Sequence, residues 1–154
     1  MNLHRRAAAL VAVFLAVIVP CAGAQQPLPV FGRWRTESGR GVIDIYQCAD
    51  KLCGRLVWLI EPIRRGAPAV DDKNPDPELR NRPLCGLVML GGFRQIEPQR
   101  WGDGWIYDPD SGKTYSATMS LESVGVLKLR GYVGIPLFGE TQTWTRADPK
   151  LGSC

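Results

Sequence analysis

The sequence TYSATMSLESVGVLKLRGYV, residues 114–133, carries the clearest strand pattern in the chain. In its first part small hydroxyl side chains alternate with a second set that shares the opposite face: Tyr115, Ala117, Met119 and Leu121. This period of two predicts a β-strand with one buried face. Glu122-Ser123-Val124-Gly125 then forms a turn, and a second strand follows from Val126 to Val133. The segment therefore predicts an antiparallel hairpin.

Further strand-like runs surround this hairpin, separated by Gly, Pro, Asp and Asn at close intervals. They are Phe31–Thr36, Gly41–Gln47, Gly54–Ile60, Gly86–Phe93, a short run at Gln99–Trp101, Gly104–Tyr107 and Glu140–Arg146. One short helix is expected after Asp76, which can serve as its N-cap, with Pro77 at the first helical position and Pro83 ending it. The chain is predicted to be all-β, with about eight or nine strands.

A small domain with this many strands has to protect its sheet edges. Closure into a barrel removes the edges altogether, whereas a two-sheet sandwich only shields them. Because the strands follow one another through mostly short loops, we expect a single antiparallel up-and-down barrel. The interior of an eight-stranded barrel is either filled by side chains or holds one small ligand.

The N-terminus has the layout of a secretory signal peptide. Arg5 and Arg6 precede an unbroken apolar run over residues 7–19, and Ala22-Gly23-Ala24 offers small residues at a cleavage site. The alternative is a membrane anchor, but 13 residues at about 1.5 Å each fall short of a hydrocarbon core of roughly 30 Å. We expect cleavage near Ala24, a barrel domain over 25–154, no membrane span after cleavage, and a periplasmic or secreted protein.

Cleavage also removes the only histidine, His4. Histidine-based catalysis and histidine-ligated metal sites are then excluded, and we expect no metal, no cofactor and no enzymatic activity. Carboxylate or tyrosine chemistry stays open as an alternative, with Asp44, Asp72 and Asp108 among its candidates. Removal of Arg5 and Arg6 leaves 17 basic against 15 acidic residues, a balance too weak to indicate nucleic acid as a partner.

Four cysteines stay after cleavage, and an even number in an exported chain indicates two disulfides. Cys48 and Cys53 flank a four-residue loop, where facing positions of a hairpin lie within disulfide range. We therefore predict Cys48–Cys53, which leaves Cys85–Cys154. The alternative, a four-cysteine zinc site, suits neither the irregular spacing nor an oxidising compartment.

Two short motifs resemble the lipocalin signature. Gly32-Arg33-Trp34 lies in the first strand, and Trp144-Thr145-Arg146 lies in the last. The resemblance implies that Trp34 closes one end of the barrel and that Arg146 packs over it. Closure of a barrel brings the first and last strands together, and a guanidinium on an indole face gains roughly 0.5–2 kcal/mol. Both residues are assigned a structural role.

A longer series of segments resembles the bacterial domain-of-unknown-function family DUF2147. The segments are Gly41–Tyr46, Leu52–Arg55, Asn74–Asp76, Leu79–Leu84, Ile106–Pro109, Ser111–Tyr115, Arg130–Tyr132 and Thr143–Arg146. They occur in order and span about residues 32–146. The resemblance implies an exported protein with a lipocalin-like barrel. The family has no assigned reaction, so the resemblance supplies no catalytic residues.

The longest connection runs from Glu61 to Leu84, and long connections in compact domains are often lids or binding loops. Its candidate lid residues are Asp72, Asn74, Asp76, Arg80 and Arg82. A calcium loop is rejected because Pro77 stands where glycine is needed and Pro83 where a bidentate glutamate is needed. The alternative is a solvated loop whose charges pair with one another.

Candidate ligand-binding residues are Tyr46, Trp58, Tyr107, Arg130 and Tyr132. If the face that carries Arg130 and Tyr132 points inward, these two and Tyr46 line a pocket for an amphiphile with an acidic head, since arginine matches carboxylate and phosphate. If that face points outward, they are ordinary surface. The sequence leaves the two orientations open.

The leading functional hypothesis is an exported barrel that binds a small apolar or amphipathic molecule. The alternative is an envelope protein–protein interaction module with a filled barrel and a working surface on the Glu61–Leu84 loop. A homodimer is left open.

Overall fold

The computed structural model describes residues 30–152 and residue 154. The predicted signal peptide and its cleavage site after Ala24 lie outside the described residues. Within the described part of the chain, no helix is long and apolar enough to cross a membrane.

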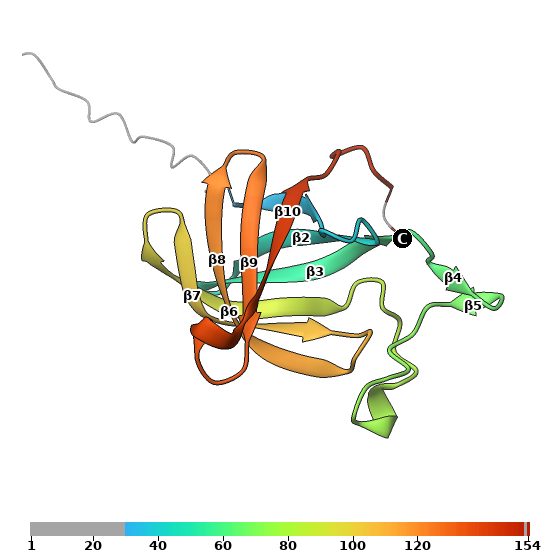
Figure 1. The fold of residues 1–154 in the computed structure, drawn as a ribbon. Helices are drawn as coiled ribbons and strands as arrows, with labels where there is room; N and C mark the ends of the chain where they lie inside the picture. The colour runs from blue at the N-terminus through green and yellow to red at the C-terminus, as the bar shows by residue number, and fades with distance from the viewer. Residues whose placement is uncertain (1–29, 153) are drawn as a thin grey trace, which may run out of the picture.

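Eight antiparallel strands form a closed barrel in the order β1-β10-β9-β8-β7-β6-β3-β2, so the first strand pairs with the last (Figure 1). Their bounds are β1 Gly32–Arg35, β2 Gly41–Cys48, β3 Lys51–Leu59, β6 Val88–Glu97, β7 Arg100–Asp108, β8 Lys113–Ser123, β9 Val126–Tyr132 and β10 Glu140–Arg146. The prediction of a single closed antiparallel barrel is confirmed, and the sandwich alternative is excluded.

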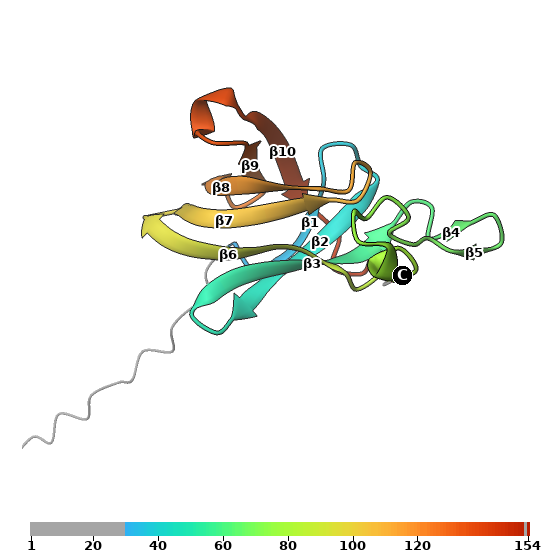
Figure 2. The same ribbon diagram turned by 90° about the horizontal axis from the view of Figure 1, so that it is seen from below.

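Three small elements lie outside the barrel wall. Two short strands, β4 (Ile63–Arg64) and β5 (Ala67–Pro68), pair as a hairpin that projects away from the barrel (Figure 2). The expected short helix is the 3-10 turn η1 (Pro77–Leu79), in which the Asp76 side chain accepts a hydrogen bond from the backbone of Glu78. A second 3-10 turn, η2 (Pro136–Phe138), lies between β9 and β10 and has no counterpart among the sequence predictions.

The alternating pattern of β8 places its apolar face inside. Ala117, Met119 and Leu121 are all buried, and their cross-strand partners on β9 are Gly131, Leu129 and Leu127 in that order. The inward face of β9 is therefore the one with Leu127 and Leu129, and Lys128 and Arg130 lie on the outer face.

One pair of predicted strands is a single strand. The structure has one strand, β7, where the sequence predicted two, at Gln99–Trp101 and Gly104–Tyr107. β7 runs from Arg100 to Asp108, and its pairing with β8 shifts register between Trp101 and Gly104. Asp103 there has φ 58°, and such a positive φ is typical of a bulge that keeps the ladder while bending the strand. The sequence Gly102-Asp103-Gly104 resembles a turn between two strands, but it forms a bulge within one strand. The barrel therefore has eight strands.

One end of the barrel is sealed around Trp34, which is fully buried. The Arg146 guanidinium lies 3.9 Å from the Trp34 ring centroid. Arg146 also donates hydrogen bonds to the carbonyls of Phe31 and Val124, at 2.6 and 2.9 Å. Burial lowers the pKa of Arg146 from its ordinary value. Trp101 and Met119, cross-strand partners on β7 and β8, are also buried near this end.

Both predicted disulfides are confirmed. Cys48–Cys53 joins the two sides of the β2–β3 hairpin, with Cα atoms 5.8 Å apart. Cys85–Cys154 joins the C-terminus to the segment before β6, with Cα atoms 5.9 Å apart. The backbone of Cys154 donates to the carbonyl of Val57, and Arg33 donates to the carbonyl of Leu151. The C-terminal tail is therefore held against β1 and β3.

Candidate functional site

The end of the barrel opposite the sealed one is surrounded by four connections. They cover residues 36–40, 60–87, 109–112 and 133–139. A cavity of two lobes lies inside this ring of loops. We call it the mouth cavity.

The first lobe has a volume of about 350 Å³. Its apolar wall comes from barrel strands and from the end of the long connection: Ile43, Leu56, Leu84, Met89, Ile106 and Trp144. Its polar rim comes mostly from the loops and includes Arg40, Glu61, Arg64, Asp108, Asp110 and Gln142. This combination of an apolar floor and a charged rim is the usual chemistry of a small-molecule site.

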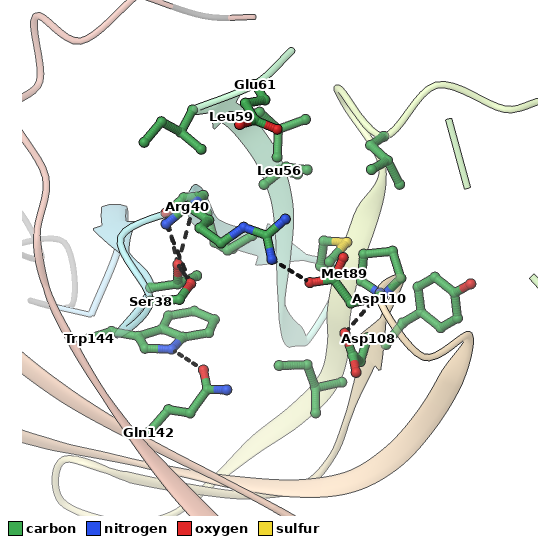
Figure 3. Close-up of a pocket in the computed structure, with 18 of the residues that line it drawn as sticks. Ser38, Arg40, Leu56, Leu59, Glu61, Met89, Asp108, Asp110, Gln142 and Trp144 are labelled. Carbon is green, nitrogen blue, oxygen red and sulfur yellow. Dashed lines mark hydrogen bonds and ion pairs between the residues drawn. The ribbon is translucent and has the colours of Figure 1, made fainter. Parts of the chain in front are cut away.

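The rim of the first lobe is cross-linked by hydrogen bonds (Figure 3). Arg40 reaches from the β1–β2 loop to Asp110, with Nη1 and Oδ2 3.2 Å apart. The Asp108 carboxylate accepts from the Asp110 backbone at 3.0 Å and from the Ser111 hydroxyl at 2.6 Å, which orders the β7–β8 turn. On the barrel wall, Trp144 Nε1 donates to Gln142 Oε1 at 2.9 Å.

The second lobe has a volume of about 330 Å³ and shares Ile106, Asp108 and Gln142 with the first. The two lobes therefore meet at one apolar and two polar side chains. The rest of the second lobe is lined by Tyr115, Leu129, Gly131, Tyr132, Val133, Phe138 and Glu140. Gly131 leaves room here, because a Cβ at this position would make only ordinary contacts of 3.6 Å and 3.7 Å with Ile106 and Tyr115.

A buried polar cluster anchors the long connection beside the first lobe. Asp71 is fully buried and Tyr107 of β7 is nearly so. Tyr107 donates its hydroxyl to Asp71 Oδ1 at 2.6 Å. Asn74 Nδ2 donates to Asp71 Oδ2 at 2.7 Å and to the Tyr107 hydroxyl at 3.1 Å. Arg82 donates to Asp71 Oδ2 through Nε at 2.9 Å and pairs with it through Nη2 at 2.8 Å.

These contacts shift two pKa values in opposite directions. Burial alone would raise the pKa of Asp71, but hydrogen bonds from Tyr107, Asn74 and Arg82, with the positive charge of Arg82, outweigh it and lower that pKa. Burial and the hydrogen bond to Asp71 raise the pKa of Tyr107. Asp71 is therefore a charged anchor with both oxygens bonded, a poor candidate for a catalytic base.

The family is decided by a match over most of the chain. Residues 32–146 match the family described as "Uncharacterized protein conserved in bacteria (DUF2147)". The chain belongs to the DUF2147 family. Its resemblance to that family, expected from the ordered segments of the sequence, is confirmed.

A solved structure supports the fold of this DUF2147 protein. Protein HP1028 from the human pathogen Helicobacter pylori, described as belonging to the lipocalin family, superposes with a TM-score of 0.69 at 24% sequence identity. The match covers 79% of this chain and 84% of that chain. At this identity the likeness concerns the fold, which is a lipocalin-like barrel. No curated protein matches the chain.

The structure separates the five candidate ligand-binding residues. Tyr107 lines the first lobe and Tyr132 lines the second. The other three line neither lobe: Tyr46 lies under the Arg55 guanidinium at 4.9 Å, and Trp58 lies under that of Arg35 at 5.0 Å.

Arg130, the third of these, holds the η2 loop. It donates hydrogen bonds to the carbonyls of Pro136 and Leu137 and to the hydroxyl of Thr141. Of the two orientations that the sequence left open, the structure has the one in which Leu129 and Ile45 are the buried residues of these strands. Arg130, Tyr132 and Tyr46 therefore do not line one pocket, and only Tyr132 reaches a lobe.

The candidate lid residues have distinct places. Asn74 and Arg82 belong to the buried cluster. Arg80 donates to the carbonyl of Asn74 at 2.8 Å, and Asp76 caps η1. Asp72 is exposed. Charged and polar side chains of the connection therefore bond to one another, as the solvated-loop alternative expected. The difference from that alternative is that the central carboxylate, Asp71, is fully buried.

Sequence reasoning missed three features of the site. Asp71 was not singled out, although it directly follows the apolar pair Ala69-Val70, a position from which a side chain can enter the core. Glu140 and Gln142, on the inward face of β10, were also missed. The η2 loop was missed as well, with four large apolar side chains that are at least half exposed: Val133, Ile135, Leu137 and Phe138. Among the described residues, no group of three or more metal-ligating side chains comes together.

Proposed function

We propose that this DUF2147 protein binds a small amphipathic molecule in the mouth cavity. The observation that carries the proposal is the contrast between a sealed barrel end at Trp34 and a two-lobed cavity at the other end. The two volumes, about 350 and 330 Å³, lie within the range of about 300–1,000 Å³ that is usual for small-molecule pockets.

The lining supports an amphipathic rather than a purely apolar ligand. Leu56, Met89 and Trp144 offer apolar contact deep in the first lobe, whereas Asp108 and Gln142 stand where the lobes meet. A purely apolar molecule that filled both lobes would cover these polar groups without replacing their contacts with water, which is costly. A ligand with an apolar body and a polar head satisfies both parts.

The buried cluster beside the cavity supports binding without catalysis. Among the described residues, Asp71 is the one fully buried carboxylate. Its side-chain hydrogen bonds all lie within the anchor cluster, and its pKa is lowered. A general acid or base at neutral pH needs a pKa shifted toward neutrality. We therefore propose a binding protein, with the Asp71 cluster positioning the long connection beside the cavity.

We also propose that the protein works outside the cytoplasm. Two disulfides, Cys48–Cys53 and Cys85–Cys154, support this compartment, because such bonds persist mainly in oxidising environments. Together with the signal-like N-terminal sequence, they favour a periplasmic or secreted carrier.

The experiment that tests the proposal is native mass spectrometry of the exported protein, combined with ligand titration followed by tryptophan fluorescence. Trp144 lines the first lobe and should report on its occupancy. Gly131→Leu should fill the second lobe and weaken binding by about tenfold or more.

Gly125→Leu is the matched control, because Gly125 lies in the β8–β9 turn at the sealed end with no atom near its missing Cβ. Its affinity should equal that of the original protein. Equal affinity of both variants, or no bound molecule and no fluorescence response to any amphiphile, would contradict the proposal.

A further inference from the structure

We propose that the second lobe is a site for a cationic head group, of the alkylammonium class, and that the first lobe takes the apolar body of the same ligand. This inference rests on the proposed function and names the class of ligand for it.

The charge of the second lobe is one-sided. Asp108 and Glu140 line it from β7 and β10, and no Lys or Arg of the described chain does. Glu140 takes part in no ion pair in the part of the chain that the structure describes. Arg130, on the neighbouring strand, directs its donors to two carbonyls and a hydroxyl of the η2 loop and the start of β10. The lobe therefore carries negative charge without a positive partner in the described chain, and a cationic ligand would supply that partner.

The second lobe is also rich in aromatic rings. Tyr115, Tyr132 and Phe138 all line it, and they come from β8, β9 and η2. Aromatic faces attract ammonium groups through the ring quadrupole, and cages of aromatic rings are a recurrent way to bind quaternary ammonium ligands. The rings and the carboxylates are separate observations, and both favour the same head group.

The route between the lobes fits such a ligand. Ile106 lines both lobes, and we place the alkyl chain along it, from the aromatic lobe to the apolar wall that includes Leu56 and Met89. The first lobe suits an acidic head less well. Of its two arginines, Arg40 already pairs with Asp110 at 3.2 Å, so Arg64 alone is left to receive an anion.

The competing ligand class is therefore an amphiphile with an anionic head on Arg64. It is separated from the cationic class by comparing three ligands with the same tail: octyltrimethylammonium, octyl glucoside and octyl sulfate. Each is titrated below its micelle concentration at physiological ionic strength, by calorimetry and tryptophan fluorescence. We expect the ammonium ligand to bind about tenfold more tightly than the glucoside, and the sulfate to bind most weakly.

Two variants locate the head group. Glu140→Gln removes a charge from an exposed side chain of the second lobe, and Phe138→Leu removes a ring but keeps apolar contact. Each should reduce the preference for ammonium over glucoside to about threefold or less. Glu78→Gln is the matched control, because Glu78 is also exposed and lines neither lobe. Its preference should stay near tenfold.

The outcomes distinguish this inference from the proposed function. If all three ligands bind alike, or the sulfate binds best, the cationic class is wrong and the amphiphile-binding cavity stands. If ammonium is preferred but Glu140→Gln and Phe138→Leu leave that preference intact, the assignment to the second lobe is wrong. If none of the three ligands binds, both the inference and the proposed function fail.

Discussion

The two ends of the barrel are built from the same eight strands, yet one end is filled and the other is hollow. At the sealed end, Trp34, Trp101 and Met119 are buried side chains of large volume, and Arg146 covers Trp34. At the open end, Gly131 occupies an inward position where its neighbours leave space. Under the proposed function, the difference divides two tasks within one barrel: the sealed end is packed with side chains, and the open end keeps room for the ligand.

The largest expected effect comes from the sealed end. Trp34→Ala should lower the free energy of unfolding by about 3–5 kcal/mol, because it opens a large cavity and removes the ring under Arg146. Ile106→Ala at the open end should cost only about 1–2 kcal/mol, because that half-buried side chain already faces a cavity. Urea unfolding of the two variants measures the difference. Similar costs at both ends would contradict the division into a filled and a hollow half.

The next effect concerns the anchor of the long connection. Asp71→Asn should cost about 2 kcal/mol, because Arg82 loses its charged partner and the buried cluster loses a bond acceptor. Asp72→Asn is the matched control: its neighbouring carboxylate is exposed, so the change should stay within about 0.5 kcal/mol. Hydrogen exchange of residues 70–84 should rise in the Asp71 variant alone. An equal response of the two variants would show that the connection is not anchored at Asp71.

The anchor also predicts a pH dependence. Since the folded pKa of Asp71 is lowered, its contribution is complete above its ordinary pKa of about 3.9 and is lost as the pH falls through the folded value. The stability difference between the original protein and Asp71→Asn should therefore be constant near neutral pH and shrink below about pH 4. Denaturant unfolding at several pH values measures it. A difference that is unchanged well below that pH would contradict the assigned charge.

Much of the fold could be predicted because its signals are local. The alternation around Ala117 and Met119 is a property of one strand. It separated the apolar face from the hydroxyl face, and the structure places the apolar face inside. The Cys48–Cys53 pair follows from the geometry of one hairpin. Trp34 and Arg146 meet, as the lipocalin resemblance implied, because closure of the barrel joins the strands that carry them.

The site was harder to predict because it depends on contacts between distant segments. The burial of Asp71 requires Tyr107, which is 36 residues away. The sequence Gly102-Asp103-Gly104 resembles a turn between strands. Only the pairing of β7 with β6 and β8 shows that it is a bulge within one strand. The inward face of β9 carries few polar groups, so a search for polar side chains selected Arg130 on its outer face. The polar residues of the cavity come instead from the surrounding loops and from the ends of β7 and β10.

Two glycines at the same level of the barrel are expected to differ, and one of them gives the smallest effect. Gly104 and Gly131 both have Ala117 as a cross-strand partner. A Cβ on Gly104 would collide with the Phe93 ring, whereas one on Gly131 would make ordinary contacts. Gly104→Ala should therefore cost about 1–3 kcal/mol and Gly131→Ala less than about 0.5 kcal/mol, by thermal or urea unfolding. The reverse order would mean that the space beside Gly131 is filled.

The central claim is that the open end binds a small amphipathic molecule and the sealed end does not. The most direct measurement is an NMR titration of the labelled, disulfide-bonded protein with octyl glucoside and octyltrimethylammonium. The account predicts shift changes at Ile106, Leu129 and Gln142, which line the cavity, and none at Trp34 or Arg146. Changes that cluster at the sealed end, or a spectrum that does not respond to either ligand, would contradict it.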